Sequence, residues 1–507
     1  MTAVPPPPDP RRRTIISPLA LGQTANVPAN ASQMVLADDE GRRLVLVELR
    51  VDPGADSRSV RNEFLQLFAD IFAGPDAPPD PTPIARHYLR CVLSADEMTR
   101  LVQGGASPTA ASTTRALQLI YRIWPDLVVK AHMDRSVTTI KADAAARTFG
   151  CTGAGVVWAV LDSGIDATHP HFATHKTLTA DVVKNLHRDF TIPSTPNAKR
   201  GPLSDLFGHG THVAGIIAGQ APRDPKKLRI AYNRPIAQNL PQWVSRTLAE
   251  GTILSGVAPK ANLVSLKVLD DNGSTVSSVI LDALNYVREI NNNGRNLRIH
   301  GVNLSLGCPW PPTEFAAGQS PLCREVDLLV GGGVTAVVSA GNAGASGLTA
   351  GIGGDVFGQL STITDPGNAA TAITVGSVHR ERPHTYGITF NSSKGPTMDG
   401  RAKPDLVAPG EAITSAATGR LVAGVGPLQP GRGDPARLAC YVDDSGTSMA
   451  AAHVSGAVAA FLSARTEYIG QPQMVKELFV STATDLGRHE FFQGAGLIDL
   501  MRVMSTV

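Results

Sequence analysis

The sequence predicts an α/β domain, in which a parallel sheet has helices on both faces, preceded by a small α+β domain. The first observation behind this is residues 156–161, a continuous apolar run that is typical of a strand buried on both sides. The second is residues 277–292, where apolar side chains recur at the spacing of one helical face. Strands that alternate with helices indicate a parallel sheet, and such sheets place their functional sites at the carboxyl ends of the strands.

Further apolar runs predict the other strands of this sheet, at residues 263–269, 302–306, 334–339 and 372–375. Two runs of small residues, one starting at His209 and one running from Ser448 to Leu462, predict helices that pack closely in a core. Two stretches, about 220–251 and 308–331, are interpreted as insertions. The large domain is assigned to residues 136–507.

The residues before this domain form a separate region. Residues 1–42 are proline-rich and are predicted to be a mobile leader. Residues 43–135 are predicted to form the small α+β domain, and 74–83 within it to be a proline-rich linker. Its predicted elements are strands at 44–51, 86–93 and 117–124, and helices at 57–72 and 94–103, the second opened by a capping box at Ser94 and Glu97.

Composition limits the class of protein. Of the 507 residues, 18% are charged and 42% are hydrophobic, as in a folded globular protein. A net charge of +2 favours neither nucleic acid nor an anionic membrane as a partner. No stretch approaches the roughly 20 apolar residues of a membrane span. No secretory signal is visible near Met1, so a cytoplasmic location is expected, or secretion if the start codon is wrongly assigned.

The five cysteines are too few and too scattered to indicate a disulfide framework or a zinc site. One bridge between Cys308 and Cys323 is left open, because both fall in one predicted loop. His209 and His212 are spaced like metal ligands on a helix, but the H-E-x-x-H pattern is absent, so no metal site is predicted.

Three residues of types that act in catalysis are predicted to lie at the carboxyl edge of the sheet, where this fold has its functional sites. Asp162 ends the first apolar strand, His209 opens one small-residue helix, and Ser448 opens the other. A helix N-terminus offers free N–H groups to the oxyanion that forms beside a serine nucleophile. Asp162 as a loop cap and Ser448 as a helix N-cap are the ordinary alternatives. The chain order Asp, His, Ser matches one of the known triad arrangements, and the missing G-x-S-x-G disfavours a lipase or esterase.

With these motifs the chain resembles the subtilisin-like serine proteases, the subtilases of peptidase family S8. Residues 160–166, 209–215 and 446–450 resemble the family's aspartate, histidine and serine motifs, and the resemblance covers about residues 137–503. It implies a subtilisin-like fold and a serine endopeptidase in which Asp162 orients the imidazole, His209 is the general base and Ser448 is the nucleophile.

The resemblance also implies how substrate is held. Residues 338–342 resemble the strand end that supplies the family's oxyanion asparagine, here Asn342. Ser305, Leu306 and Gly307 resemble the edge that pairs with the substrate backbone. Ala340 and Gly341, which precede Asn342, are expected to wall a pocket for an apolar or aromatic side chain on the acyl side of the cut.

The sequence departs from the family pattern at Ala452, where proline is usual. His171 is expected to be exposed in a loop, whereas His212 and His453 are expected to be hydrogen-bonded core residues. The chemistry is expected to need no cofactor. Structural calcium is frequent in relatives, but its ligands are not placed residue by residue here.

The small N-terminal domain resembles the family's propeptide, although one strand of that pattern is not found in residues 74–85. The resemblance implies a zymogen in which this domain inhibits the active site in cis and is cut off between about His132 and Thr138. Its segment 127–132 is expected to lie along Ser305–Gly307 as a substrate does. A permanent regulatory or docking domain is the alternative. For the whole chain the alternative is a catalytically silent peptide-binding module, which would predict damaged triad motifs, and none is damaged.

Overall fold

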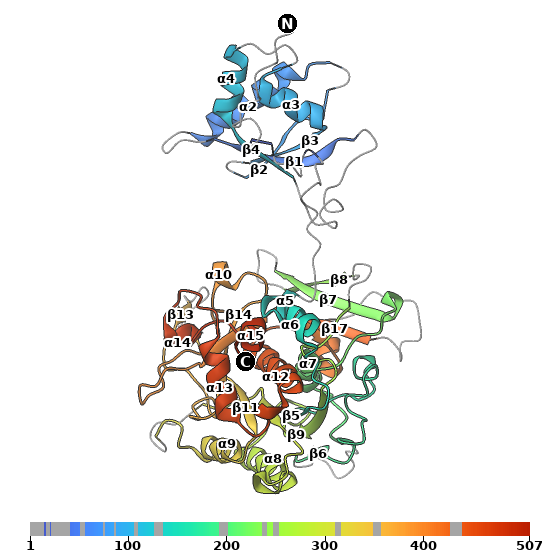
Figure 1. Cartoon of the computed structure of the whole chain (residues 1–507), viewed down its shortest axis with the longest axis vertical. Helices are drawn as coiled ribbons and strands as arrows, with labels where there is room; N and C mark the ends of the chain where they lie inside the picture. The colour runs from blue at the N-terminus through green and yellow to red at the C-terminus, as the bar shows by residue number, and fades with distance from the viewer. Residues whose placement is uncertain are drawn as a thin grey trace. The chain divides into compact units, whose positions relative to one another are not determined.

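The computed structural model of the chain (Figure 1) describes these residues: 15–16, 21, 41–50, 56–74, 77–85, 88–105, 110–125, 135–191, 201–235, 241–246, 253–309, 316–347, 356–425 and 439–507. The chain divides into two compact units, residues 1–131 and 132–507. The sequence analysis placed the boundary between residues 135 and 136.

The second unit is built on one seven-stranded sheet in the order β15-β14-β11-β10-β5-β9-β6, with every neighbouring pair parallel. The strands are β5 (Val157–Asp162), β6 (Arg188–Asp189), β9 (Asn262–Lys267), β10 (Gly301–Leu304), β11 (Thr335–Ser339), β14 (Ile373–His379) and β15 (Leu406–Glu411). All five apolar runs that were predicted as strands lie in this sheet, so the prediction of a parallel α/β fold is confirmed.

Helices cover both faces of the sheet (Figure 1). One face packs against α6 (Ala142–Phe149), α7 (His209–Ile217), α12 (Thr447–Ala464), α13 (Pro472–Ser481) and α15 (Leu500–Thr506), and the other against α8 (Ser277–Ile290) and α9 (Pro321–Gly331). Along β5, Trp158 and Val160 enter the first core, whereas Val157, Ala159 and Leu161 enter the second. This double burial explains the continuous apolar run.

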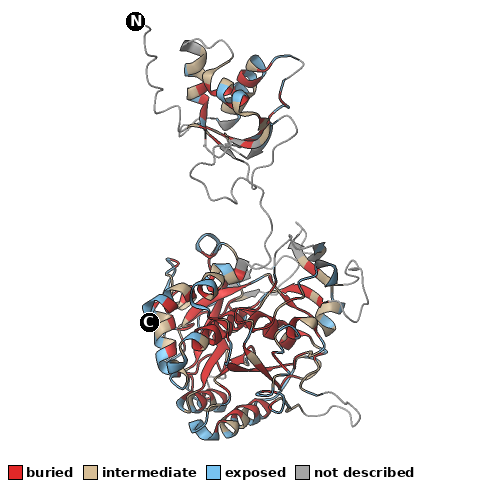
Figure 2. Ribbon diagram, turned by 45° about the vertical axis from the view of Figure 1, so that its right-hand side comes forward, coloured by how far each residue is buried: buried red, intermediate tan, exposed pale blue. Residues whose placement is uncertain are grey.

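Helix α12 runs through the centre of the unit, where Figure 2 shows it buried along most of its length. A Cβ added at Gly456 would lie 2.7 Å from Cβ of Val257, so only small residues allow this close approach. Within the part of the chain that the structure describes, only α12 is long and apolar enough to cross a membrane. Because 89% of that stretch is buried inside the unit, packing in the core accounts for its apolar character.

The two predicted insertions have different places in the fold. Residues 220–251 contribute β7 (Leu228–Pro235) and β8 (Pro241–Arg246) to a second sheet of order β16-β17-β7-β8, with β16 (Ile413–Ala416) and β17 (Ala439–Asp444). Of residues 308–331, the last eleven form α9, which connects β10 to β11 and packs in the core. That part was wrongly interpreted as an insertion.

The other α-helices and strands in the described part of the second unit are short. They are α5 (Arg135–Thr139), α10 (Pro383–Tyr386), α11 (Gly419–Ala423), α14 (Glu490–Gln493), β12 (Ala345–Gly347) and β13 (Val356–Gly358).

In the part that the structure describes, the first unit is an antiparallel sheet of order β2-β3-β1-β4 with helices α2, α3 and α4. Its elements are β1 (Arg43–Leu49), α2 (Ser57–Ile71), β2 (Thr82–Ala85), β3 (Tyr88–Leu93), α3 (Ala95–Gln103), α4 (Ala110–Leu119) and β4 (Ile120–Pro125). The capping box at Ser94 and Glu97 is confirmed.

Three predictions for this unit need correction. The strand predicted at 117–124 begins only at Ile120, because residues up to Leu119 complete α4. The strand that the sequence did not reveal is β2, which lies inside the proline-rich stretch. The predicted leader also contributes to the fold, since Ile16 pairs with Ile123 of β4 and is 7% exposed.

Candidate active site

The site is centred on a hydrogen-bonded aspartate and histidine. Asp162 is the last residue of β5 and His209 is the first residue of α7. His209 Nδ1 lies 2.8 Å from Oδ1 and 3.0 Å from Oδ2 of Asp162. Asp162 is fully buried, whereas the His209 side chain is 19% exposed. Because the carboxylate accepts a hydrogen bond from Nδ1–H, the neutral ring keeps Nε2 free to act as a base.

The charges around His209 favour its protonated form. Burial lowers the pKa of this imidazole, but the charge of Asp162, its hydrogen bond, and the charges of Asp444 and Asp205 act in the opposite direction. Together they raise the pKa of His209 to about 9. The site therefore stabilises the imidazolium that forms when a histidine takes a proton during catalysis.

Asp205 fixes the start of α7 and was missed in the sequence analysis. Its carboxylate is 3% exposed and accepts four hydrogen bonds, which come from Ser163 Oγ (2.9 Å), Gly208 N (2.8 Å), Thr211 N (2.8 Å) and Thr211 Oγ1 (2.7 Å). Burial raises the pKa of Asp205. The carboxylate thus joins the residue after Asp162 to the helix turn that carries His209.

The residue before His209 has to be glycine. Gly208 has φ +97°, which side chains rarely tolerate, and a Cβ there would lie 2.4 Å from the Thr418 carbonyl oxygen. The glycine therefore lets the chain turn sharply into α7 and places the histidine at the edge of the sheet.

Ser448 is the second residue of α12 and is 9% exposed. Its Oγ donates to the Ser305 carbonyl (3.2 Å), and Ser305 Oγ donates to the Ser448 carbonyl (2.9 Å). Asn303 Nδ2 donates to Ser305 Oγ (2.8 Å), and Ser455 Oγ donates to Asn303 Oδ1 (2.9 Å). This buried network ties the start of α12 to the end of β10. Among the described residues, no hydrogen bond joins Ser448 Oγ to His209.

Asn342 lies three residues beyond β11, beside the start of α12. Its Oδ1 accepts hydrogen bonds from Thr447 N (3.0 Å) and Thr447 Oγ1 (3.1 Å). Because a backbone N–H only donates, this contact fixes which way the amide is turned. Asn342 Nδ2 is left with no hydrogen bond to the described residues, as is the backbone N–H of Ser448.

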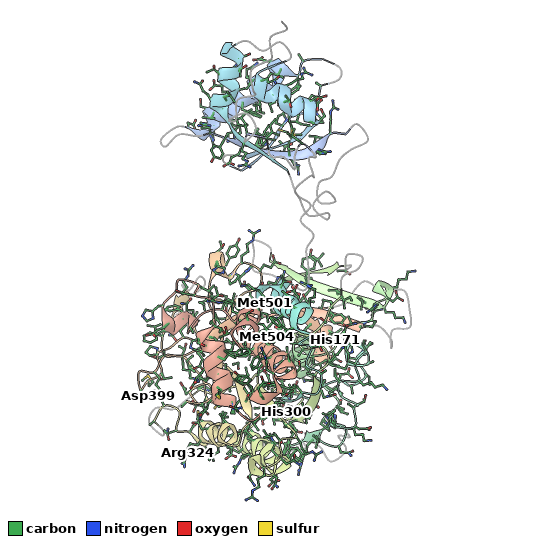
Figure 3. The ribbon with its side chains drawn as sticks, viewed as in Figure 1. His171, His300, Arg324, Asp399, Met501 and Met504 are labelled. Carbon is green, nitrogen blue, oxygen red and sulfur yellow. The ribbon has the colours of Figure 1, made fainter. Side chains whose placement is uncertain are left out.

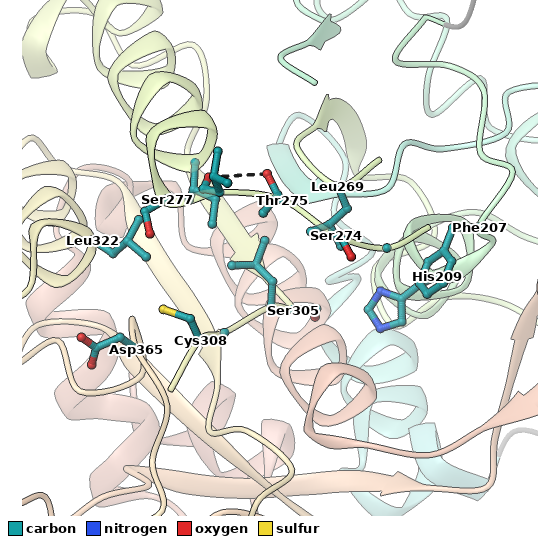
Figure 4. Close-up of a pocket in the computed structure, with 15 residues that line it drawn as sticks. Phe207, His209, Leu269, Ser274, Thr275, Ser277, Ser305, Cys308, Leu322 and Asp365 are labelled. Carbon is teal, nitrogen blue, oxygen red and sulfur yellow. Dashed lines mark hydrogen bonds between the residues drawn. The ribbon is translucent and has the colours of Figure 1, made fainter. Parts of the chain in front are cut away.

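A cavity of about 390 Å³ adjoins His209 (Figure 4). Its wall includes the predicted residues Ser305, Leu306 and Gly307. The other lining residues are Phe207, His209, Leu269, Gly273, Ser274, Thr275, Val276, Ser277, Ile280, Cys308, Leu322 and Asp365. The predicted residues Ala340, which is buried, and Gly341, which is half-buried, are not in this lining.

The other sequence-based candidates form neither a disulfide nor a metal site. Cys308 and Cys323 are both free thiols, so the bridge left open above is not formed. His212 and His453 are buried and hydrogen-bonded to the carbonyls of Val442 and Met449, as predicted. Among the described residues, no group of three or more His, Cys, Asp or Glu could hold a metal ion. Structural calcium stays a prediction without assigned residues.

His171 was wrongly expected to be exposed. Labelled in Figure 3, it lies inside the second unit and is 2% exposed. Its Nδ1 lies 3.0 Å from Tyr441 Oη, and its Nε2 lies 3.2 Å from the carbonyls of Gly215 and Ala218. Burial, followed by the neighbouring His169, lowers the pKa of His171 to about 3. It is a neutral core residue behind α7.

A family model described as the subtilase family matches residues 153–497, which include Asp162, His209, Asn342 and Ser448. The chain belongs to this family. This subtilase is a serine-type endopeptidase that acts on protein substrates, and the family's catalysis needs no cofactor.

Two curated relatives come from Bacillus subtilis (strain 168). Subtilisin E is 31% identical over 364 residues, which cover 72% of this subtilase and 69% of the relative. Serine protease AprX is 28% identical over 386 residues, covering 75% and 73%. A solved cold adapted subtilisin-like serine proteinase matches 69% of this chain and 89% of its own, at 23% identity and a TM-score of 0.42.

Proposed function

We propose that this subtilase cleaves peptide bonds with Asp162, His209 and Ser448 as its catalytic triad. The observation that carries the proposal is the Asp162–His209 hydrogen bond of 2.8 Å at the carboxyl edge of the sheet. Ser448 is tied to the same edge through the two hydrogen bonds between it and Ser305.

In the proposed mechanism, Ser448 Oγ turns from the Ser305 carbonyl towards His209 Nε2 as substrate enters. His209 takes the hydroxyl proton while Oγ attacks the scissile carbonyl carbon. The buried Asp162 carboxylate holds the ring and stabilises its positive charge. His209 then gives the proton to the leaving amine, and water hydrolyses the acyl-enzyme by the same route.

The oxyanion has two donors available in the proposed site. They are Asn342 Nδ2 and the backbone N–H of Ser448 at the start of α12, where the helix dipole also favours negative charge. Thr447 supports this role. Its N–H and hydroxyl donate to Asn342 Oδ1, so the Nδ2 group of the same amide points away from Thr447. Loss of one such donor costs about 10²–10³ in rate.

We propose that the substrate chain lies extended beside Ser305, Leu306 and Gly307. Gly307 is exposed and leaves its backbone open to pairing, while the adjoining cavity accepts side chains of the acyl part. When the substrate is paired in this way, the carbonyl group of one substrate residue lies between Ser448 and Asn342.

A fluorophosphonate probe tests the triad against the silent peptide-binding alternative. Wild-type protein should take up about one probe per chain at Ser448, identified by peptide mass, and should hydrolyse casein until it is labelled. A folded protein that binds casein without labelling or hydrolysis would support the silent module instead.

The pH dependence of kcat/KM should report the raised pKa of His209. An ordinary imidazole loses its proton near pH 6.5. Because the pKa of His209 is raised to about 9, the base stays protonated to higher pH. Activity on an uncharged peptide should therefore rise with pH, and its inflection should lie well above 6.5.

Asp162→Asn tests the cause of that shift. Removing the charge should move the inflection down towards 6.5 and lower the maximal rate about 10⁴-fold, because the ring loses its orienting carboxylate. Asp166→Asn is the matched control, since this carboxylate is not among the groups that raise the pKa of His209. An inflection that stays in place in Asp162→Asn would contradict the assignment.

We also propose that the first unit is an inhibitory propeptide. Its support is the α+β fold of its described residues, in which four antiparallel strands occur with helices α2, α3 and α4, and its position in the sequence, immediately before the unit that carries the triad. The segment 127–132, expected to mimic substrate, lies outside the described residues, so the proposal depends on order along the chain.

A further inference from the structure

The backbone is hydrogen-bonded on both sides of Asn342, the proposed oxyanion donor. Gly341 N donates to Thr447 Oγ1 (3.2 Å), and the Gly341 carbonyl accepts from Ser393 N (2.9 Å). On the other side, Ala343 N donates to Ser393 Oγ (3.1 Å). Ser393 is fully buried and thus connects to both chain neighbours of the asparagine.

Residues 391–394, the supporting segment, also hold Gly344. The Gly344 N–H donates to the Asn391 carbonyl (3.0 Å), and the Gly344 carbonyl accepts from Lys394 Nζ (2.7 Å). A Cβ added at Gly344 would lie 1.8 Å from the Ser392 carbonyl oxygen and 2.5 Å from Lys394 Nζ. The supporting segment therefore lies in direct contact with the chain that follows the oxyanion asparagine.

Lys394 is a buried cation held by backbone carbonyls. It is 5% exposed, and its Nζ donates to the carbonyls of Gly344 (2.7 Å), Phe390 (3.0 Å) and Ser392 (3.1 Å). An ammonium has three N–H donors, so these carbonyls use all of them. Because hydrogen bonds from a charged donor are strong and a buried charge is costly without partners, Lys394 fixes the positions of the three carbonyls.

We propose that Lys394 and Ser393 are positioning residues that hold Asn342 Nδ2 at the place where the oxyanion develops. This inference rests on the proposed function, in which Asn342 is an oxyanion donor. Thr447 determines which way the amide is turned, whereas the supporting segment fixes the backbone that carries it. The support matters because a displacement of about 1 Å at a catalytic group can cost about 100-fold in rate.

Lys394→Met tests the proposal, because methionine fills a similar space and donates no hydrogen bond. The variant should lower the kcat for one peptide by about 10- to 100-fold at nearly unchanged KM, since the donor acts on charge that develops in the transition state. Active-site titration with the fluorophosphonate probe gives the concentration of competent enzyme, so a loss of folded protein is not counted as a loss of kcat.

A double-mutant cycle with Asn342→Ala separates positioning from a structural role. Asn342→Ala alone should lower kcat by about 10²–10³-fold. In that background Lys394→Met should change kcat less than about 3-fold, because the donor that Lys394 positions is already gone. A fall in kcat as large as in the background that keeps Asn342 would contradict the proposal.

Lys476→Met is the matched control. On α13, Lys476 Nζ donates to the carbonyls of Ala370 (2.9 Å) and Ala372 (2.8 Å), which precede β14, and it pairs with Asp405 (2.9 Å). These contacts lie at the amino end of the strand, opposite the site. The control should keep the wild-type kcat. An equal fall in kcat would indicate a general effect on the fold and overturn the proposal.

Ser393→Ala decides the matter if thermal unfolding shows that Lys394→Met does not fold. It removes the acceptor of Ala343 N and leaves Lys394 in place, so kcat should fall at least about 3-fold at unchanged KM. Unchanged kcat in the folded variants would overturn the positioning role while Asn342→Ala still loses rate. If Asn342→Ala itself keeps the wild-type kcat, the oxyanion assignment fails as well, so the two failures are distinguishable.

Discussion

Replacing Ser448 by alanine should lower the kcat for peptide hydrolysis by about 10⁶-fold, the scale known for loss of the nucleophile in a subtilisin. Without Oγ no acyl-enzyme forms, and His209 has no hydroxyl proton to take. The donors at Asn342 Nδ2 and Ser448 N remain, so a residual rate about 10³–10⁴ above the uncatalysed reaction should persist. Steady-state kinetics on one peptide measure the difference, with the wild-type concentration taken from active-site titration and that of Ser448→Ala from total folded protein.

The fold should survive this substitution. Ser448 Oγ makes one hydrogen bond, to the Ser305 carbonyl, and losing it should cost about 1 kcal/mol of unfolding free energy. Ser481→Ala is a matched control, because its exposed hydroxyl on α13 likewise bonds one carbonyl, that of Leu478. It should keep full activity. Unchanged hydrolysis by folded Ser448→Ala protein would remove Ser448 from the mechanism.

The sequence predicted the sheet well because its strands are buried on both faces. Residues 156–161 and the four later runs have few polar side chains, and short apolar runs of this kind are typical of the central strands of a parallel sheet. Asp162 and His209 were predicted to lie at a strand end and a helix start, and the structure has them at these positions. Their hydrogen bond follows from the chain geometry at this edge of the sheet.

Local sequence patterns gave wrong predictions at positions where contacts with distant residues determine the structure. The run 117–124 is largely apolar, but Leu119 is buried beside α2 and completes α4, so the strand starts at Ile120, three residues later than predicted. Pro83 argued against a strand, yet β2 is an edge strand, where a missing N–H is tolerated. The buried position of His171 depends on its contact with Tyr441, which lies 270 residues away in the sequence.

Asp205 was missed for a related reason. A lone aspartate in a loop carries no catalytic pattern, and two of its four hydrogen bonds come from backbone N–H groups, which a sequence does not display. Its distance from the start of α7 was the available signal, because a carboxylate shortly before a helix often binds the free N–H groups there. The structure adds Ser163, which connects this carboxylate to the residue next to Asp162.

Self-processing should remove the first unit from wild-type protein and leave Ser448→Ala at full length. The first described residues after this unit, Arg135–Thr139, form α5, and Ser136 within it is 7% exposed. A protease needs an extended, accessible chain, so the cut should fall before Arg135. This narrows the interval of His132 to Thr138 that the sequence suggested.

Cleavage should occur within one molecule. A bond tethered to its own active site has an effective concentration in the millimolar range, far above that of a second molecule in dilute solution. The rate constant for processing should therefore be independent of protein concentration over roughly a 100-fold dilution, because the effective concentration of a tethered bond does not change with dilution. A rate that falls in proportion to dilution would indicate cleavage between molecules.

Under the proposed propeptide assignment, the released unit should remain as an inhibitor until it is degraded, because cutting one peptide bond leaves its proposed binding surface unchanged. Intact-mass measurement should show wild-type protein shortened by about 130 residues, in line with a first unit that ends at residue 131. Peptidase activity should then rise with a lag while the intact Ser448→Ala chain stays unchanged over the same time. Fully active wild-type enzyme that retains its first unit would overturn the propeptide assignment, and would support a permanent regulatory or docking domain in its place.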